Sequence, residues 1–259
     1  MDLKYIRFES KDEIAWVSFN RPEKLNALNP EVIKDLEIAL AHCENDDTIR
    51  VIALRGNDKA FIAGTDIGEM LKADIKLVYQ LADQTRRVQE RLADLPKPTI
   101  AAISGYALGG GCEVALCCDF RIAAENAVFG FPEITLGIIP GGGGTQRMPR
   151  LVGMGPATEL IFSGDMIKAD KALEIGLVNK VVPLKNLKTE VETIASKLIR
   201  RPALALRAAK TAMRKGCNPS LNQGLQIEQD LFCMLFGTED QKEGMAAFIE
   251  KRKPDFKGR

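Results

Sequence analysis

The feature that most constrains the fold of this chain is the order in which strand-like and helix-like segments follow one another. Apolar segments of strand length occur at residues 5–9, 14–19, 51–54, 99–103 and 120–123. Segments with helical periodicity alternate with them at residues 30–44, 71–95 and 112–118. Strand pairs that are followed by helices predict a layered, mixed α/β fold.

Local signals mark where several of these segments begin and end. Lys11-Asp12-Glu13 separates the first two strands and fits a hairpin turn. Asn29 followed by Pro30 favours a helix start, because Asn caps free backbone N–H groups and Pro is tolerated in the first turn. Pro96 and Pro98 are expected to end the second long helix.

The pattern changes near residue 187, where the strand signals stop. Helices are expected at residues 187–200, 203–214, 219–235 and 239–250. This part of the chain is predicted to form a helical C-terminal subdomain. Its third helix carries an apolar stripe made of Ile227, Leu231, Leu235 and Phe236. We interpret this stripe as core packing, although contacts between subunits would give the same pattern.

Length and composition restrict the classes of function. The 259 residues allow one large domain, or one domain with a small helical appendage. A content of 46% hydrophobic and 27% charged residues is typical of a folded globular protein. The net charge of +1 gives no global electrostatic reason to bind nucleic acid. No apolar run reaches the roughly 18 residues that a membrane span needs.

The cysteines and the single histidine argue against metal and triad chemistry. None of the six cysteines forms a C-x-x-C pair, and the adjacent Cys117 and Cys118 are poor joint ligands for a metal. We expect reduced, mostly buried thiols in a cytoplasmic protein, and no metal site. His42 lies inside the first helical pattern, so we expect a surface or helix-terminal residue rather than a catalytic base.

Glu113 is the first candidate catalytic residue. It follows Gly109-Gly110-Gly111 at the start of a predicted helix, where free backbone N–H groups can stabilise a developing negative charge. Glycines also let a substrate approach the backbone closely. The segment lacks the G-K-[ST] ending of a phosphate-binding P-loop. The alternative interpretation is an acid that only complements the helix dipole.

Glu133 is the second candidate. It follows Phe131-Pro132 inside the apolar stretch VFGFPEITLGIIP. A carboxyl group among such neighbours has a raised pKa and can hold a proton near neutral pH. Two glutamates near a backbone site for an oxyanion suit proton transfer next to a carbonyl group. The alternative interpretation is an exposed loop acid, with Pro132 fixing the turn.

The last residues, 251–259, are locally basic (KRKPDFKGR). We expect a solvated C-terminal end. The sharper alternative is attraction of an anionic ligand, such as a phosphorylated cofactor.

The chain resembles the crotonase, or enoyl-CoA hydratase/isomerase, superfamily over nearly its whole length. The signature segment of that superfamily is similar to ISGYALGGGCE at residues 103–113. Further similar segments, in the same order as in the superfamily, are NRPEKLNAL at 20–28, FIAGTDI at 61–67, FGFPE at 129–133, GIIPGGGGTQR at 137–147 and EGMAAFIEKR at 243–252. The occurrence of these motifs in the right order makes the resemblance specific.

The resemblance implies an α/β crotonase-like spiral of ββα units with a helical C-terminal trimerisation region. The implied division is a core at residues 1–195, with the CoA and active sites, and an oligomerisation region at 196–259. Members of the superfamily are usually trimers or dimers of trimers. Residues 69–84 are expected to border the acyl pocket.

The resemblance also implies roles for individual residues. Glu113 and Glu133 would be catalytic, and the backbone N–H groups of Thr65 and Gly110 would form an oxyanion hole. Many relatives have Ala in place of Thr65, whose contact is through the backbone. The implied CoA-binding residues are Lys24, Leu25, Ala27, Ala63, Asp66 and Ile67, together with Phe248 and Lys251 of a neighbouring subunit. Ala63, Asp66 and Ile67 would act chiefly through backbone groups.

Because both glutamates are present, the implied function is hydration of trans-2-enoyl-CoA in fatty-acid or related acyl-CoA degradation. No metal or redox cofactor is expected, since CoA arrives with the substrate. Isomerases of the superfamily typically lack an acid at the position of Glu113. The alternatives are double-bond isomerisation, hydration of cyclic or dienoyl-CoA, and, more remotely, an inactive RNA-binding relative. Near-neutral charge argues against RNA binding.

Overall fold

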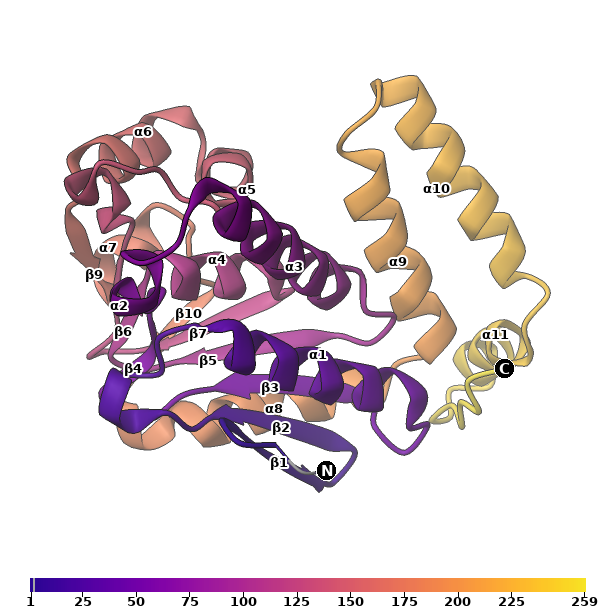
Figure 1. Cartoon of the computed structure of the whole chain (residues 1–259). Coiled ribbons are helices and arrows are strands. Elements are labelled where there is room, and N and C mark those ends of the chain that lie inside the picture. The colour runs from indigo at the N-terminus through magenta and orange to yellow at the C-terminus, as the bar shows by residue number, and fades with distance from the viewer. Residues whose placement is uncertain (2) are drawn as a thin grey trace.

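The strands of the structure, a computed structural model that describes residue 1 and residues 3–259, form two sheets (Figure 1). The first sheet contains, in spatial order, β1 (Ile6–Lys11), β2 (Ile14–Phe19), β3 (Val51–Arg55), β5 (Thr99–Ile103), β7 (Phe120–Ala124) and β10 (Lys180–Val182). The second contains β4 (Ala60–Ala63), β6 (Tyr106–Leu108), β8 (Val128–Gly130) and β9 (Met166–Lys168). Among the strand pairs of the described residues, β1–β2 and β8–β9 are antiparallel and the others are parallel.

Helices follow the strands and then take over the C-terminal part of the chain. The α-helices are α1 (Pro30–Asn45), α2 (Ile67–Met70), α3 (Ile75–Asp94), α4 (Gly110–Cys117), α5 (Gly144–Val152), α6 (Met154–Ser163), α7 (Ala169–Glu174), α8 (Leu187–Ile199), α9 (Ala203–Gly216), α10 (Leu221–Leu235) and α11 (Glu239–Ile249). Short 3₁₀ helices are η1 (Pro22–Lys24), η2 (Pro132–Leu136) and η3 (Leu184–Asn186).

The chain winds as a spiral between the two sheets. β3, β5 and β7 enter the first sheet, and the strand after each of them, β4, β6 and β8, enters the second. Helices α3 and α4 link successive turns, so the repeating unit is ββα. The prediction of strand pairs followed by helices, and of a spiral of ββα units, is confirmed.

Period-two alternation in the first sheet explains its two apolar cores. Ile52, Leu54, Ala101 and Ile103 face the interior shared with the second sheet and α1. Their neighbours Val51, Ala53, Ile100 and Ala102 face the opposite side, where they pack on Val191 and Ala195 of α8. Burial of each large side chain stabilises the fold by about 1.5–3 kcal/mol. The sheet is therefore covered on both faces and holds the spiral rigid.

Local chemistry accounts for the predicted boundaries. Asp12 and Glu13 both have positive φ, at 52° and 62°, as a tight two-residue hairpin turn requires. Asn29 caps α1 by accepting a 2.9 Å hydrogen bond from the Val32 N–H, and Pro30 follows it. The helix predicted over residues 71–95 instead begins at Ile75, because Asp74 caps it by accepting from the Leu77 N–H.

The second sheet and helices α5 to α7 were not predicted from the sequence. β6, β8 and β9 of the second sheet, like β10 of the first, have only three residues each, which is too short for periodicity to reveal. Gly109 and Gly143 stand directly before α4 and α5, so neither helix has a side-chain cap to signal its start. The glycines instead bring backbone N–H groups to the surface of the site described below.

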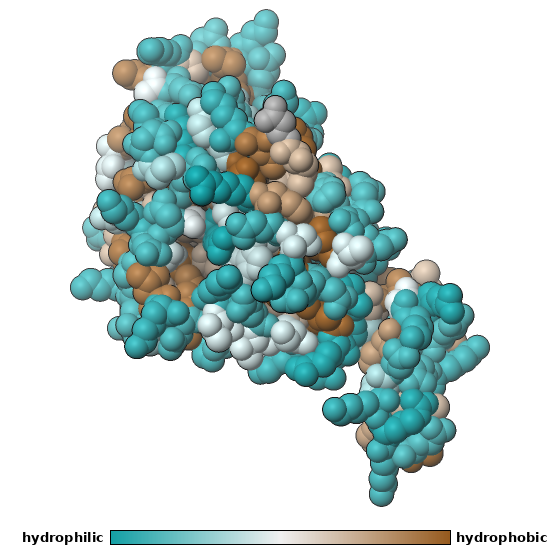
Figure 2. All heavy atoms as spheres, turned by 90° about the horizontal axis from the view of Figure 1, so that it is seen from below, coloured by the Kyte–Doolittle hydropathy of each residue, from teal (hydrophilic) through white to brown (hydrophobic). Residues whose placement is uncertain are grey.

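Helices α9 and α10 lie side by side as an arm beside the spiral, and α11 lies at its foot (Figure 1). The arm is attached through the buried Lys210 of α9, whose Nζ lies 2.8 Å from Asp119 Oδ2 and 3.2 Å from the Lys97 carbonyl oxygen. Gly216 and Gly224 pack backbone against backbone where α9 and α10 turn. Seen from below, the surface is mostly hydrophilic, and the C-terminal helices project from the body (Figure 2).

The interpretation of the α10 stripe as core packing is wrong for this chain. None of the residues of α10 is buried. Ile227, Leu231 and Leu235 are half-buried, and Phe236 is exposed. Large apolar side chains nearby, such as Phe232 and Met234, are also exposed. Two helices packed only on each other cannot bury both faces, so the stripe does not form a core.

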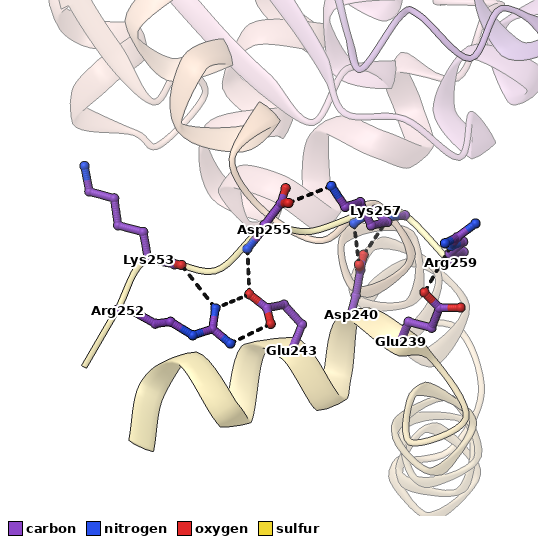
Figure 3. A network of polar contacts seen from close by, with 9 residues as sticks. Glu239, Asp240, Glu243, Arg252, Lys253, Asp255, Lys257 and Arg259 are labelled. Atoms are coloured by element: carbon purple, nitrogen blue, oxygen red, sulfur yellow. Dashed lines mark hydrogen bonds and ion pairs between the residues drawn. The ribbon is translucent and has the colours of Figure 1, made fainter. Parts of the chain in front are cut away.

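The C-terminal end is solvated, as predicted, since most of residues 251–259 are exposed, but it is also ordered, because residues 252–259 fold back along α11 (Figure 3). Arg252 donates to both carboxylate oxygens of Glu243, at 2.6 and 2.8 Å. The buried Asp240 accepts from the N–H groups of Lys257 and Gly258, at 2.6 and 2.9 Å. The hydrogen bonds from Arg252 hold the pKa of Glu243 down to about 2. Among the described residues, no helix is long and apolar enough to cross a membrane.

Candidate active site

Glu113 lies in the first turn of α4, as predicted, and its side chain is 3% exposed. Its Oε1 accepts hydrogen bonds from the backbone N–H groups of Gly142 and Gly144, at 2.7 and 2.8 Å. Arg147 donates to the Gly142 carbonyl oxygen at 2.9 Å and so holds this loop in place. The interpretation of Glu113 as an acid that only complements the helix dipole is therefore wrong.

Burial is the main influence on the acidity of Glu113. Loss of hydration raises the pKa of its carboxyl group. The hydrogen bonds from Gly144 and Gly142 and the charge of Arg147 act in the opposite direction, because each favours the ionised form. The two backbone donors saturate Oε1, whereas the described residues give Oε2 no hydrogen bond. Oε2 is thus the oxygen that remains free for a reacting group.

Glu133 lies in η2, directly after the buried Phe131 and Pro132. It is half-buried rather than an exposed loop acid, and its Oε2 has no hydrogen-bond partner among the described residues. Burial, with a smaller contribution from the charge of Glu113, raises the pKa of Glu133 to about 7. The carboxyl group packs against Gly109, which has φ +47° and no side chain to occupy that space. Glu133 can therefore carry a proton at neutral pH.

Thr65 and Gly110 come from distant parts of the chain and meet beside the glutamates. Leu28 forms a parallel bridge with Thr65, through hydrogen bonds from the Leu28 N–H to Gly64 and from the Asp66 N–H to Leu28, both 2.8 Å. The Thr65 N–H takes no part in this bridge. The Gly110 N–H is the first in α4 and has no acceptor inside the helix. Thr65 Oγ1 lies 3.2 Å from where a Cβ on Gly110 would be.

Both glutamates and both backbone donors line one cavity of about 640 Å³. Its remaining wall is mainly apolar. The side chains of this wall come from α1, the α2–α3 segment, β6 and the segment after η2, and include Leu28, Ile33, Ile67, Met70, Ala73, Val78, Leu81, Ala82, Leu108, Leu136, Ile138 and Ile139. Residues of the segment 69–84 therefore line this cavity, and the prediction that it is the acyl pocket stays a prediction. Two carboxyl groups, two backbone N–H groups and an apolar chamber are thus brought together.

The predicted CoA residues of the N-terminal half differ in their position relative to the cavity. Ala63 and Ile67 line the cavity, while Lys24 and Leu25 are exposed on η1 and at its end. The Asp66 side chain is hydrogen-bonded within the chain, because its carboxylate accepts from Arg21 at 2.8 Å and from the Gly68 N–H at 3.1 Å. The Asp66 N–H donates to the Leu28 carbonyl oxygen at 2.8 Å, and the Asp66 carbonyl oxygen accepts from the N–H groups of Glu69 and Met70. A role of Asp66 in CoA binding stays a prediction.

Ala27 is 8% exposed, and its carbonyl oxygen accepts a 3.1 Å hydrogen bond from the same Arg21 side chain. Phe248 and Lys251 lie at the end of α11, which stands away from α2 and α4 of the same chain (Figure 1). Phe248 is 86% exposed. The assignment of these two residues to a neighbouring subunit's site stays a prediction.

The residues set aside on sequence grounds do not lie in the cavity. His42 is in α1, 3.6 Å from Asp46 and edge-on to Phe8. Cys43, Cys112, Cys117 and Cys118 are buried free thiols, whereas Cys217 and Cys233 are exposed. Within residue 1 and residues 3–259, no group of three or more His, Cys, Asp or Glu side chains is placed to hold a metal ion.

Several residues that contact or face Glu113 were not predicted from the sequence. Gly142 and Gly144 hold Glu113, and only the glycine run at residues 141–144 hinted at a backbone contact. Gln89 of α3 is fully buried and faces Glu113 beside Gly142. No sequence signal singled it out, because a glutamine in a charged, periodic helix is expected at the surface.

Comparison with known proteins places this site in a family. A family model described as enoyl-CoA hydratase/isomerase matches residues 9–259. The chain belongs to the enoyl-CoA hydratase/isomerase family. The resemblance inferred from the sequence motifs is thereby confirmed.

Individual relatives of the family match over the full length. A short-chain-enoyl-CoA hydratase of Clostridium acetobutylicum is 45% identical over 100% of both chains. A 2,3-dehydroadipyl-CoA hydratase of Escherichia coli is 45% identical over 96% of this chain and 97% of its own. The crystal structure of an enoyl-CoA hydratase from Bacillus anthracis superposes with a TM-score of 0.95 at 41% identity, over 99% of this chain and 100% of that one. The crotonase-like α/β fold is therefore the fold of this chain.

Proposed function

We propose that this chain is an enoyl-CoA hydratase that adds water across the 2,3 double bond of trans-2-enoyl-CoA to give 3-hydroxyacyl-CoA. The observation that carries the proposal is the pairing of Glu113 and Glu133 in one apolar cavity beside two unpaired backbone N–H groups. Hydration needs a base for water, an acid for the α carbon and donors for the carbonyl oxygen. Each need has a candidate group here.

In the proposed mechanism, the thioester carbonyl oxygen accepts from the N–H groups of Thr65 and Gly110. The free Oε2 of the ionised Glu113 removes a proton from a water molecule, and the oxygen of this water attacks Cβ. Glu133, neutral, gives a proton to Cα. The negative charge that develops on the thioester oxygen is stabilised by the two backbone donors, each contributing about 3 kcal/mol. The raised pKa of Glu133, about 7, supports its role as the acid.

The proposed reaction needs no separate cofactor. Water and the enoyl group together contain all the atoms of the product, and no electrons are transferred to another molecule. One proton enters the glutamate pair and one leaves it in each turnover. CoA arrives as part of the substrate.

The cavity wall favours a short to medium, uncharged acyl chain. Among the described residues that line it, Glu113 and Glu133 are the only charged ones, and Lys, Arg and His are absent. An acyl chain that ends in a carboxylate, as in the substrate name of the E. coli relative, would lack a cation to pair with there. The Clostridium relative is named for short chains, which fits this chamber better.

We also propose self-association through the C-terminal arm, as a trimer or a dimer of trimers. Phe232, Met234, Phe248 and Ile249 are exposed on α10 and α11 by 60% or more, and monomers rarely leave such a set uncovered. In that assembly, Phe248 and Lys251 of one subunit would close over the CoA of another. Free thiols at all six cysteines support a reducing, cytoplasmic location, with acyl-CoA degradation as the setting.

The experiment that tests this function measures hydration of three substrates by purified protein: crotonyl-CoA, trans-2-decenoyl-CoA and a 3-enoyl-CoA. Loss of the conjugated-thioester absorbance with the two 2-enoyl substrates, and formation of 3-hydroxyacyl-CoA, is the expected result. Conversion of the 3-enoyl ester to the 2-enoyl ester without hydration would favour the isomerase alternative. No reaction with any of them would contradict the proposed function.

A further inference from the structure

Gln89 is an unusual buried side chain. It lies on α3 with 0% exposure, and neither Nε2 nor Oε1 has a hydrogen-bond partner among the described residues. The buried Asn26, by contrast, donates to the carbonyl oxygens of Ala60 and Phe61 and accepts from the Arg21 N–H. A buried amide without partners is costly, so an unpaired one marks a place where a further contact is made.

The carboxamide of Gln89 and the free oxygen of Glu113 face the same point in the structure. That point is where a Cβ on Gly142 would stand, 2.5 Å from Glu113 Oε2, 2.7 Å from Gln89 Nε2 and 2.9 Å from Gln89 Oε1. Because Gly142 has no side chain, nothing separates the amide from the carboxylate there. The amide faces Oε2, whereas the loop donors hold Oε1.

We propose that Gln89 is a positioning residue, whose carboxamide N–H donates to Glu113 Oε2 in the working enzyme and fixes the carboxylate for attack by water. This proposal rests on the proposed role of Glu113 as the base. A glutamine amide offers two donor hydrogens, and a hydrogen bond to an ionised oxygen is stronger than one to a neutral group. In this arrangement, one lone pair of Oε2 accepts from the Gln89 N–H, and the other faces the cavity and the attacking water.

The other groups that face Glu113 set its charge environment. Glu133 approaches from η2, Arg147 from α5, and the thiols of Cys112 and Cys117 lie on α4 itself. From α3, the facing group is the neutral Gln89. Removal of its N–H therefore leaves the backbone donors and Arg147 as the groups that favour the ionised form, and the pKa of Glu113 rises further.

The test compares Gln89→Met with wild type, using kcat, KM and the pH profile for crotonyl-CoA together with Tm. Methionine keeps the length and removes both polar atoms. We expect kcat to fall about 10- to 100-fold with KM within twofold, and the acidic limb of the pH profile to move to higher pH. The control is Glu37→Met, at an exposed position of α1 that does not line the cavity, and it is expected to stay within twofold of wild type.

A purely structural amide would give a different result: Gln89→Met would keep wild-type kcat and pH profile while Tm rises or stays the same. That outcome overturns the proposal. Gln89→Glu is the second variant if the methionine variant does not fold. Its acid form can donate to Oε2 and its ionised form cannot, so kcat is expected to fall more steeply with pH than in wild type. A profile that matches wild type contradicts the proposal.

A parallel Glu113→Gln variant separates the two proposals. If Glu113→Gln is inactive and Gln89→Met is normal, only the role of Gln89 fails. If Glu113→Gln hydrates crotonyl-CoA at the wild-type rate, the role of Glu113 fails and that of Gln89 fails with it.

Discussion

The backbone N–H of Gly142 lies 2.7 Å from Glu113 Oε1, and this contact fixes the carboxylate at the start of α4 against the loop before α5. Gly144 adds a second donor to the same oxygen at 2.8 Å. The orientation of Glu113 therefore depends on a loop that lies about thirty residues further along the chain. Substitutions in that loop should therefore change catalysis by moving Glu113.

Gly142→Ala is expected to lower kcat strongly without unfolding the protein. A Cβ there would lie 2.5 Å from Glu113 Oε2, so the carboxylate must move. A displacement of about 1 Å in such a group typically costs about 100-fold in rate. Steady-state kinetics with crotonyl-CoA provides the measurement. Gly155→Ala is the matched control, because a Cβ at that exposed position meets nothing within 4 Å. Equal activity of both variants would contradict the positioning of Glu113 by this loop.

The glutamate pair is expected to give kcat/KM a bell-shaped dependence on pH. The active pair carries one proton, on Glu133, while Glu113 is ionised. The pKa of Glu133 is raised to about 7, so kcat/KM should fall about tenfold per pH unit well above that value. At low pH, Glu113 takes up a second proton and kcat/KM falls. Because burial raises the pKa of Glu113, this fall begins at a higher pH than it would for an exposed glutamate.

Hydration involves no net uptake of protons, so the reverse dehydration should give the same bell. Measurement of kcat/KM in both directions from pH 5 to pH 9 tests this expectation. A flat profile across the neutral region would show that Glu133 does not supply the proton.

Thr65→Ala and Gly110→Ala should behave differently, although the two residues are neighbours. Thr65 contributes its backbone N–H, which alanine keeps, so kcat should stay within about threefold. A Cβ on Gly110 would lie 3.0 Å from Leu28 Cδ1 and 3.2 Å from Thr65 Oγ1, crowding the space between the two donors. Loss of one oxyanion-hole donor costs about 10²–10³ in kcat. A large loss with Thr65→Ala would indicate that the hydroxyl, rather than the backbone, contacts the substrate.

Arg21 is expected to stabilise the segment that presents Thr65. Its side chain donates to Asp66 Oδ2 at 2.8 Å and to the Ala27 carbonyl oxygen at 3.1 Å. Arg21→Met should lower stability by about 1–3 kcal/mol, because the buried Asp66 loses its partner. For a chain of this size, each 1 kcal/mol lowers Tm by about 2–4 °C. Asp66→Asn should cost less, since an amide still accepts from Arg21.

The pH dependence of this pair has a definite sign. Arg21 lowers the pKa of Asp66 below its ordinary value of 3.8. The stabilisation is therefore complete above pH 3.8 and is lost as the pH falls through the lowered pKa of the folded state. Thermal unfolding of wild type and Arg21→Met at pH 7 and pH 3 measures the difference, which should shrink at the lower pH. A difference that grows on acidification would contradict this assignment.

The sequence predicted those elements that are long, or that begin or end at residues with a clear capping or turn preference. The α1 cap at Asn29, the hairpin at Asp12 and Glu13, and the four C-terminal helices followed from local chemistry. The three-residue strands of the second sheet did not, because their pairing depends on contacts made only after the spiral has closed.

Within the site, Glu113 and Glu133 were identified from their neighbours and from the family motifs. Their raised pKa values depend on burial by segments distant in sequence, and only the direction for Glu133 could be anticipated. The loop donors to Glu113 and the buried amide of Gln89 could not be predicted, since no local pattern indicates which backbone N–H or helix face meets a given carboxylate.

The most direct measurement of the paired-glutamate mechanism is the rate of crotonyl-CoA hydration by wild type, Glu113→Gln and Glu133→Gln. The dissociation constant for butyryl-CoA is measured alongside, because this ester has no double bond to hydrate. Each variant is expected to lose about 10²–10⁴-fold in kcat and to bind butyryl-CoA within threefold of wild type. Wild-type turnover by either variant, or a loss that is explained by weaker binding, would contradict the mechanism.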